Sequence, residues 1–590
     1  MQDGGGNRMK RRTMIAAIGI AAGISLAAAG CGSAGNTTGA DTAEESSTSQ
    51  DSTADGQTAS QQEGSSDGTT TDGSGGPGDG QAPDGNGGPG DGQAPDGNGG
   101  PGDGQAPAGN GGPGSGQAPD GNGGPGGGAD TQTYDYEGDT SGALTADGEA
   151  VTSDQEKTES DTADENAALV KNGGTLTLTG GTLTKSGDDT NGDNCNFYGI
   201  NSVLLTMGEG SRAYVSGSTL SASSEGSNGL FATDSGVIYA SDDTIHTTEG
   251  NSRGLDATYG GTILADGMEI HTEGDHSAAA ATDRGGGNVS VTNSSLEAEG
   301  SGSPLLYSTG DIEADNVTGT ASGSQIAGME GYNTILIQNS DLTSTITGRT
   351  ASDPVANAVI IYQSTSGDAD TATGEKALFQ AVDSKLTSSI QEGSFFYITN
   401  TTADILLSNT QLSFDSDQAK LLTVEGNDSN NWGKEGENGG TVTFTARDET
   451  LEGGISVDTI SSLDLYLLDG TTYTGAVSIT ENEAASEKSA APVTVNVDSS
   501  STWVVTADST VSNLNVENGA RLVDESGKTV TIVADGKTAV KGTSDITVTV
   551  TGTYSTSVST SEANEISTDT IDRTDFDKYY GTSTTFGENS

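Results

Sequence analysis

The chain has 590 residues, of which 85 are acidic and 23 basic, so its formal net charge at pH 7 is −62. Such a charge repels phosphate backbones and anionic lipid surfaces, which excludes nucleic acid and an anionic membrane face as the bound partner. Only 30% of the residues are hydrophobic and 4% aromatic, a composition typical of disorder if it were spread evenly. It is uneven, because residues 13–156 contain no Lys or Arg whereas the later sequence alternates apolar and polar residues. We therefore expect a tail followed by a folded body.

The N-terminus has the organisation of a secretory signal. Four basic residues precede an apolar stretch over residues 14–29 that is short and rich in Ala and Gly for a transmembrane helix. The letters LAAAGC that follow resemble the lipobox of bacterial lipoproteins, with Ala28 where Leu is commonest. The resemblance implies a signal peptide over residues 1–30 and lipidation of Cys31, and a plain secretory signal is the alternative. Cys195 would then be a free thiol, for which packing is favoured over reactivity.

Residues 31–130 have the composition of a flexible spacer. They are mostly Gly, Ser, Thr, Asp, Gln and Pro, and cannot bury enough apolar surface to fold. The unit GGPGDGQAPDGN recurs every 12 residues from Gly75, without the Gly at every third position that collagen needs. About 100 such residues span roughly 55 Å on average. We predict a disordered acidic linker here, followed by a transitional segment over residues 131–165.

The body consists of repeats, which are clearest between residues 230 and 325. Four consecutive copies are LFATDSGVIYASDDTIHTTEGNSRG, LDATYGGTILADGMEIHTEGDHSA, AAATDRGGGNVSVTNSSLEAEGSGSP and LLYSTGDIEADNVTGTASGSQ, beginning at Leu230, Leu255, Ala279 and Leu305. Repeats of this length indicate a stacked array, in which each copy is covered by its neighbours. The sequence predicts a solenoid over residues 166–545 and a C-terminal tail over residues 546–590.

Apolar residues recur in three columns when the copies are aligned. The columns are Ile238, Ile263 and Val289; Ala240, Ala265 and Val291; and Ile245, Ile270 and Leu296. The residues between them are polar or mixed, which is the alternation of short strands with one buried face. Copies of this length suit a coil of three strands, each pairing in parallel with its counterpart about 4.8 Å away. The predicted fold class is an all-β parallel β-helix.

This pattern of rungs resembles the right-handed parallel β-helix proteins, the group that contains pectate-lyase-like enzymes, autotransporter passengers and bacterial adhesins. The resemblance covers residues 166–545 and rests on the repeat. A repeat pattern indicates the fold but not the function. It implies two classes of function, a binding or adhesive surface and a polysaccharide lyase or hydrolase. The enzymes of this group place charged residues on the outer face of successive rungs.

A polar column follows the first strand of each repeat. It consists of Asp234, Tyr259, Asp283, Thr309, Glu330 and Gln363. Two rungs separate Asp234 from Asp283, about 9.6 Å, close to the roughly 6.5–9.5 Å of an inverting carboxylate pair. Neighbouring corners carry Arg253, Arg284 and His276, which could act as a base or a substrate clamp. An ion pair of Arg284 with an Asp, and Asp side chains that cap their own turns, are the alternatives. The candidate catalytic residues are Asp234, Asp283, Arg284, Glu330 and His276.

Two further columns could contact a ligand. Thr233, Thr258 and Thr282 form a ladder of hydroxyls that, with Tyr259, could bind a partner, and packing at a corner is the alternative. His246 and His271 share an outward column with Glu297, so we expect them to stack about 4.8 Å apart on the surface. A solvated ladder is favoured there over a metal site, since no third ligand has an established spacing.

Acidic loops make calcium the one cofactor that the sequence suggests. The loop SGDDTNGDN carries Asp188, Asp189 and Asp193, and the loop SGDAD carries Asp368 and Asp370. Carboxylate oxygens suit hard cations, but neither loop has the spacing of an EF-hand, and an exposed acidic turn is the alternative. The sequence contains no Walker, Rossmann, zinc or nucleophile-elbow pattern.

These features together predict an extracytoplasmic lipoprotein at the cell surface. Its lipid anchor would be the only contact with the membrane, and the acidic linker would carry the β-helix outward. We expect the β-helix to act as an adhesin or a polysaccharide-binding module, with a polysaccharide or a host or cell-surface ligand as partner. The alternative is a polysaccharide lyase or glycoside hydrolase of the pectate-lyase-like type.

Overall fold

The computed structural model describes residues 132–364, 369, 371, 375–429, 433–434 and 436–587. The predictions for the signal peptide, Cys31, the linker and the loop with Asp368 and Asp370 lie outside these residues. The chain divides into two units at Gly104, and every described residue belongs to the second. No helix among the described residues is both long and apolar enough to cross a membrane.

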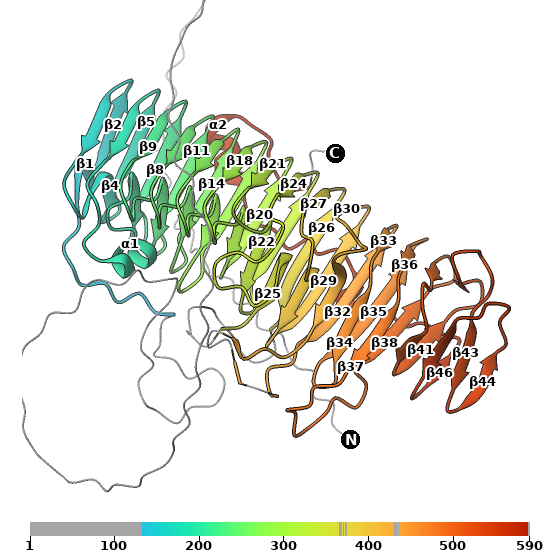
Figure 1. The fold of residues 1–590 in the computed structure, drawn as a ribbon. Helices are drawn as coiled ribbons and strands as arrows, with labels where there is room; N and C mark the ends of the chain where they lie inside the picture. Colours follow the sequence, from blue (N-terminus) through green and yellow to red (C-terminus); the bar gives the residue numbers. More distant parts are fainter. Residues whose placement is uncertain are drawn as a thin grey trace, which may run out of the picture. The chain divides into compact units, whose positions relative to one another are not determined.

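Three long sheets form the described unit, and all neighbouring strands within them are parallel. As far as β30, each coil of the chain contributes one strand to each sheet in turn, so the strands follow one another in chain order (Figure 1). We call them sheets A, B and C. Sheet A consists of β1 (Ser141–Asp147), β4 (Glu165–Lys171), β7 (Leu204–Met207), β10 (Leu230–Thr233), β13 (Leu255–Ala257), β16 (Ala280–Thr282), β19 (Leu306–Ser308), β22 (Ala327–Glu330), β25 (Asn357–Tyr362), β28 (Ser394–Thr399), β31 (Lys420–Val424), β34 (Ile455–Asp458) and β37 (Val477–Thr480).

Sheet B is the longest of the three. It consists of β2 (Ala150–Asp154), β5 (Thr175–Thr179), β8 (Arg212–Ser216), β11 (Val237–Ser241), β14 (Thr262–Asp266), β17 (Asn288–Thr292), β20 (Asp311–Asp315), β23 (Thr334–Gln338), β26 (Ala377–Val382), β29 (Thr402–Ser408), β32 (Thr441–Arg447), β35 (Ser462–Leu468), β38 (Val493–Val497), β41 (Asn513–Val516) and β46 (Tyr554–Ser555). Sheet C consists of β3 (Lys157–Ser160), β6 (Thr182–Lys185), β9 (Thr219–Ala222), β12 (Thr244–Thr247), β15 (Glu269–Thr272), β18 (Ser295–Ala298), β21 (Thr318–Ala321), β24 (Asp341–Ser344), β27 (Lys385–Ser388) and β30 (Gln411–Ser413).

Two short sheets complete the last coils. The first contains β33 (Thr450–Glu452), β36 (Thr472–Thr474), β39 (Thr502–Val504) and β42 (Arg521–Val523). The second contains β40 (Ser509–Val511), β45 (Thr547–Val550), β43 (Thr531–Ala534) and β44 (Lys537–Val540), and its β43–β44 pair is antiparallel. The described helices are α1 (Gly192–Tyr198), the 3-10 turn η2 (Glu562–Asn564) and α2 (Thr574–Tyr580). The predicted fold, an all-β parallel β-helix, is confirmed.

The interior is built from the predicted apolar columns. Ile238 pairs with Ile263, and Ile263 with Val289, on consecutive strands of sheet B. Ile245 and Ile270 pair in the same way on sheet C. All of these side chains are buried. The narrow interior explains how a chain with few apolar residues forms a core, because each coil has to bury only a handful of them.

The turn between sheets B and C depends on residues that tolerate a positive φ. The first turn residue has φ 56° at Asp242, 51° at Asn293 and 56° at Asn316. Asn and Asp enter this left-handed region at lower cost than other residues with a Cβ. Their side chains also connect the coils, since Asn316 Nδ2 donates to Asn293 Oδ1 at 2.7 Å. The corner residues seen in the sequence therefore form a ladder along the stack.

The strands begin earlier than the sequence predicted. Residues 131–165 were expected to be transitional, but β1, β2 and β3 already form a coil, and β1 pairs with β4 from Ser141 onward. Ala146 of β1 is fully buried and pairs with Val170. The buried strand positions of this coil are Ala146, Ser153 and Ser160, so its apolar pattern is too sparse to distinguish from a linker.

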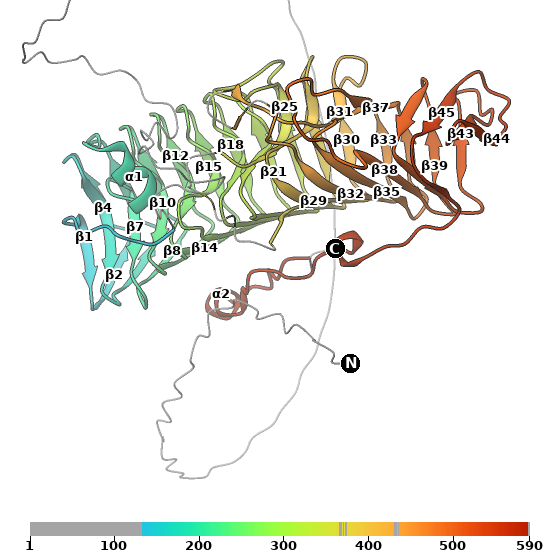
Figure 2. The ribbon, with the colours of Figure 1, turned by 90° about the horizontal axis from the view of Figure 1, so that it is seen from below.

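The C-terminal segment is not a free tail. After β46, residues 556–587 run back past the outer face of sheet B toward the early coils, which brings α2 close to strands far away in the sequence (Figures 1 and 2). We call these residues the C-terminal strap. They follow one outward column of sheet B: Asn564 Nδ2 donates to Thr445, Ser567 N to Gln380, and Tyr580 Oη to the carbonyl of Tyr239. The sequence of the strap consists of polar residues with scattered aromatics and has no repeat period, so it does not predict this docking.

Candidate functional site

The predicted threonine ladder lies inside the protein. Thr233, Thr258 and Thr282 are all fully buried. Thr258 Oγ1 donates to Thr233 Oγ1 at 2.8 Å, while Thr282 Oγ1 accepts the N–H of Thr309 at 2.9 Å. The hydroxyls therefore satisfy one another and the backbone at a corner, and the prediction that they form a binding surface is wrong.

The register of the predicted polar column also needs correction. Ala257 pairs with Thr282, so Asp283 follows in the position of Thr258 and not in that of Asp234 and Tyr259. The letters ATD occur at residues 232–234 and again at 281–283, and matching them shifted the third copy by one residue. A shift of one residue moves a side chain to the other face of a strand. Asp234 and Asp283 are therefore not equivalent positions of one outward column.

Asp283 belongs instead to a buried ion-pair cluster. Its Oδ2 accepts a hydrogen bond from Arg253 Nη2 at 3.0 Å, and its Oδ1 accepts from the N–H of Arg284 at 2.8 Å. Arg253 also lies 3.5 Å from Asp256, which is fully buried. Burial raises the pKa of Asp256, although the charge of Arg253 opposes this rise. The cluster is packed beneath α1, where Arg253 Nη1 donates a hydrogen bond to Asn196. Its charged groups therefore pair with one another inside the protein.

The remaining catalytic candidates are dispersed around this cluster. The guanidinium of Arg284 lies 3.6 Å from the centre of the Phe197 ring. Asp234 and His276 occupy corners with positive φ, where burial raises the pKa of Asp234 and lowers that of His276. Glu330 is buried, and its carboxylate accepts from Tyr307 Oη at 3.4 Å and from Ser364 N at 3.2 Å.

Tyr259 is part of an aromatic cluster near the first coils. It is 8% exposed, and its ring stacks on Tyr198 with a centroid distance of 5.6 Å. Tyr134 meets it edge-on at 5.4 Å. Burial raises the pKa of Tyr259. The ring is thus a packing residue between α1 and the segment that precedes β1.

The acidic loop proposed for calcium does not converge on one point. Asp188 accepts from the N–H of Glu225 at 3.2 Å, and Asp193 lies in the first turn of α1. Burial raises the pKa of Asp189, whose carboxylate hydrogen-bonds to Cys195. Cys195 itself is buried, and burial raises the pKa of its thiol. Within the described residues, the groups of three or more side chains close enough to share a metal do not include these aspartates.

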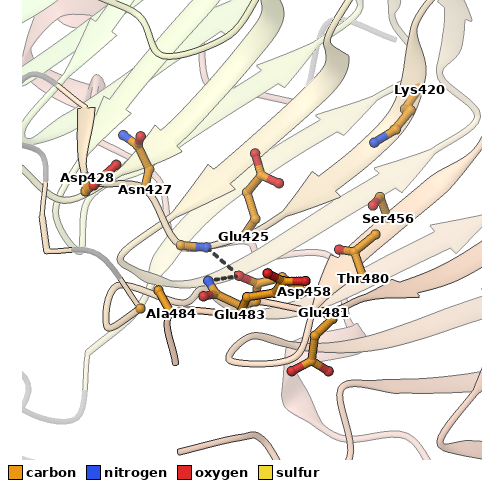
Figure 3. A pocket seen from close by; sticks show the side chains of 13 residues that line it. Lys420, Glu425, Asn427, Asp428, Ser456, Asp458, Thr480, Glu481, Glu483 and Ala484 are labelled. Carbon is orange, nitrogen blue, oxygen red and sulfur yellow. Dashed lines mark hydrogen bonds between the residues drawn. The ribbon is translucent and has the colours of Figure 1, made fainter. Parts of the chain in front are cut away.

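An open groove lies farther along sheet A, over the ends of β31, β34 and β37. Its volume is about 490 Å³. Carboxylates, amides, hydroxyls and one ammonium group line it: Lys420, Glu425, Asn427, Asp428, Ser456, Asp458, Thr480, Glu481, Asn482 and Glu483. Figure 3 shows Asp458 between the segment that follows β31 and the segment that follows β37.

Successive coils place the acidic groups of the groove in line. Val424 pairs with Val457, and Val457 with Ile479, so the next residues, Glu425, Asp458 and Thr480, continue one column. Adjacent members of a column are about 4.8 Å apart along the stack. The groove therefore presents a row of oxygen atoms at the spacing of the strands.

Asp458 is held rigidly in this row. Its Oδ2 accepts hydrogen bonds from Gly426 N and Asn482 Nδ2, both at 3.0 Å, and its Oδ1 accepts from Ile460 N at 3.2 Å (Figure 3). Glu425 is half-buried, and burial raises the pKa of its carboxyl, against which the charge of Lys420 acts. Tyr397 hydrogen-bonds to Glu425 from the preceding coil. Both carboxylates thus have fixed positions, and they differ in environment.

No protein-family model matches this sequence, and no curated protein matches it. The site must therefore be interpreted from its own geometry. The repeat pattern does not reveal the groove, because the groove's residues come from three coils whose repeat period is blurred. The one signal was local: the letters VEG at 424–426 and VDT at 457–459 place an acid directly after an inward Val.

Proposed function

We propose that this protein is a surface lipoprotein, anchored through Cys31, that binds a polysaccharide in the groove on sheet A. The observation that carries the proposal is the row of Glu425, Asp458 and Thr480 on consecutive coils, which lines the groove and runs from the buried Asp458 to the exposed Thr480. Sugar rings carry adjacent hydroxyl groups. These groups donate hydrogen bonds to carboxylate and amide oxygens and accept hydrogen bonds from amide N–H groups. The parallel β-helix is compatible with either an adhesin or a carbohydrate-active module.

The charge of the groove favours a neutral polysaccharide over an acidic one. Five carboxyl side chains line the groove, those of Glu425, Asp428, Asp458, Glu481 and Glu483, against the single ammonium group of Lys420. Together with the net charge of −62, they would repel a uronic acid chain unless a cation bridged the two. Hydrogen bonds from neutral hydroxyls to carboxylates carry no such penalty and are about twice as strong as bonds between neutral groups.

The test is binding of the full chain, with Cys31→Ser to prevent acylation, to a panel of neutral and acidic polysaccharides. We expect affinity for a neutral member, and an Asp458→Asn variant should bind it on the order of tenfold more weakly, the loss of one charged hydrogen bond. Asp464→Asn is the matched control, because it removes the same charge at an exposed position of sheet B. Equal affinity of both variants and the parent, or no binding to any polysaccharide, would refute the proposal.

A second candidate function, glycoside hydrolysis, is favoured by one observation. Burial raises the pKa of Glu425, while the adjacent Asp458 accepts three hydrogen bonds from surrounding N–H groups. Two neighbouring carboxyls in different environments are the pair that such hydrolysis needs, one as the acid and the other as the base. Reducing ends released from the bound polysaccharide, and lost with binding retained in Glu425→Gln, would establish it. Their absence would leave binding as the function.

A further inference from the structure

Histidine is rare in this chain, and its placement is uneven. The 590 residues contain three histidines. Two of them, His246 and His271, pair directly on the neighbouring strands β12 and β15 of sheet C. Their rings stack with centroids 4.9 Å apart and planes inclined by 13°. The sequence placed these two residues in one outward column, and the structure confirms that they stack.

Each imidazole faces a glutamate from the next coil. His246 Nε2 lies 2.8 Å from Glu273 Oε1, and His271 Nε2 lies 3.1 Å from Glu299 Oε1. Glu297 continues the histidine column on β18. The ε-nitrogens of both rings therefore point toward carboxylate oxygens on the same side of the column.

These atoms lie close enough together to share one ion. One ligand atom each from His246, His271 and Glu273 all lie within 4.8 Å of one another. A second set of the same closeness consists of His271, Glu297 and Glu299, and it shares His271 with the first. The first set alone supplies two imidazoles, and small side-chain rotations would bring its three atoms to the roughly 2.0–2.2 Å that zinc takes from nitrogen and oxygen.

The groups are accessible, and their backbone is fixed. The side chains of His246 and His271 are 43% and 31% exposed, so an ion can reach them from solvent. Four consecutive residue pairs hold β12 to β15 in register. The ligands therefore need to move only as side chains, and the chain's negative charge raises the local concentration of cations.

We infer that His246, His271 and Glu273 form a binding site for a divalent transition metal of the zinc, copper and nickel class. Imidazole nitrogen selects these metals, whereas calcium and magnesium prefer ligand sets made of oxygen. The site lies on sheet C and is separate from the groove on sheet A, so it goes beyond the proposed function. Three protein ligands would leave a coordination position open to water or to a partner's side chain.

The experiment titrates Zn²⁺ into the full chain, with Cys31→Ser, by isothermal calorimetry in a large excess of Ca²⁺. The calcium occupies generic carboxylate sites, so the remaining heat reports a site with nitrogen ligands. The test variant is His246→Thr/His271→Thr, because the same column carries Thr320 and Thr343 in later coils and should accept this residue. Unchanged circular dichroism checks the fold.

We expect the double variant to bind one equivalent of Zn²⁺ fewer than the chain that keeps both histidines. Glu273→Gln should weaken binding on the order of tenfold or more. The matched control is His276→Asn, which removes the third histidine while Asn tolerates the φ of 55° found there. Binding that is unchanged in the double variant, or lost equally in the control, would overturn the inference.

Discussion

Sheets A and B are formed by the same coils, yet their outer faces meet solvent differently. The outward column of sheet B carries three consecutive large residues, Tyr214, Tyr239 and Leu264, and the C-terminal strap covers them. The outward column of sheet A ends with small polar residues, Thr423, Ser456 and Ser478, of which Ser456 lines the groove and Ser478 is exposed. Large apolar residues on an outer face require a cover, whereas small polar residues leave a depression that water can fill.

The early coils of sheet A support the same rule. There the outward column carries Leu205 and Phe231, which pack with Ile200 at the end of α1. In both sheets, the large apolar residues of the outward column are thus covered, by the segment around α1 or by the strap. The difference teaches that the strap has a structural role, and that the groove is free for a ligand because its column needs no cover.

Removal of the strap should have the largest effect. A chain that ends after residue 556 loses Phe576, which is fully buried against Tyr239 and Leu264, and exposes the apolar column. Loss of a buried Phe alone costs about 3–5 kcal/mol, so we expect at least this decrease in the free energy of unfolding. Guanidinium unfolding followed by tryptophan fluorescence measures it.

The control for this truncation ends after residue 587 and keeps all the described strap contacts. It should unfold at the same denaturant concentration as the full chain. If both truncated chains unfold like the parent, sheet B needs no cover, and the comparison between the two faces fails.

The next effect concerns a single anchor of the strap. Arg573 is 2% exposed, and its guanidinium donates to the carbonyl oxygens of Ser290 and Ala265 at 2.8 and 3.1 Å. Arg573→Ala removes these hydrogen bonds from a buried charged donor, and each such bond contributes about 1.5–3 kcal/mol. The same unfolding measurement tests this. Lys578→Ala on the exposed side of α2 should change stability by about 1 kcal/mol or less, and equal losses in both variants would contradict the anchoring role.

The sequence could predict what repeats from coil to coil. Ile238, Ile263 and Val289 were found because inward positions alternate and recur, and His246 and His271 were found for the same reason on the outer face. Register was lost at Asp283, where identical letters stand at different structural positions. A single extra residue in a turn is enough to cause this, because turn length varies more freely than strand spacing.

Contacts between segments far apart in the sequence have no signal in the repeat pattern. Ile571 N donates to Glu313 Oε1 across 258 residues, and Ser567 N donates to Gln380 across 187. Neither partner stands out in its own repeat, because a polar residue at an outward position is the common case. The groove was missed for a related reason, since Glu425 and Asp458 become neighbours only when coils with different loop lengths are stacked.

The smallest effect we expect is on the pH dependence of stability, compared between one carboxyl of each face, the buried Glu313 and the half-buried Glu425. Burial raises the pKa of Glu313, beneath the strap, from 4.5 to about 7. Between pH 4.5 and pH 7 the Glu313 carboxyl loses its proton more readily in the unfolded chain than in the folded chain. The free energy of unfolding therefore falls as pH rises from 4.5 to 7, and the loss is complete above 7. The shift corresponds to at most about 3 kcal/mol.

Glu313→Gln cannot ionise and should escape this loss. Its stability relative to the parent should therefore rise between pH 4.5 and pH 8, as measured by unfolding at both pH values. Burial also raises the pKa of Glu425 in the groove, but this side chain is half-exposed, so Glu425→Gln should gain less over the same range. A larger gain at Glu425 than at Glu313 would mean that the groove, and not the strap interface, is the drier of the two surfaces.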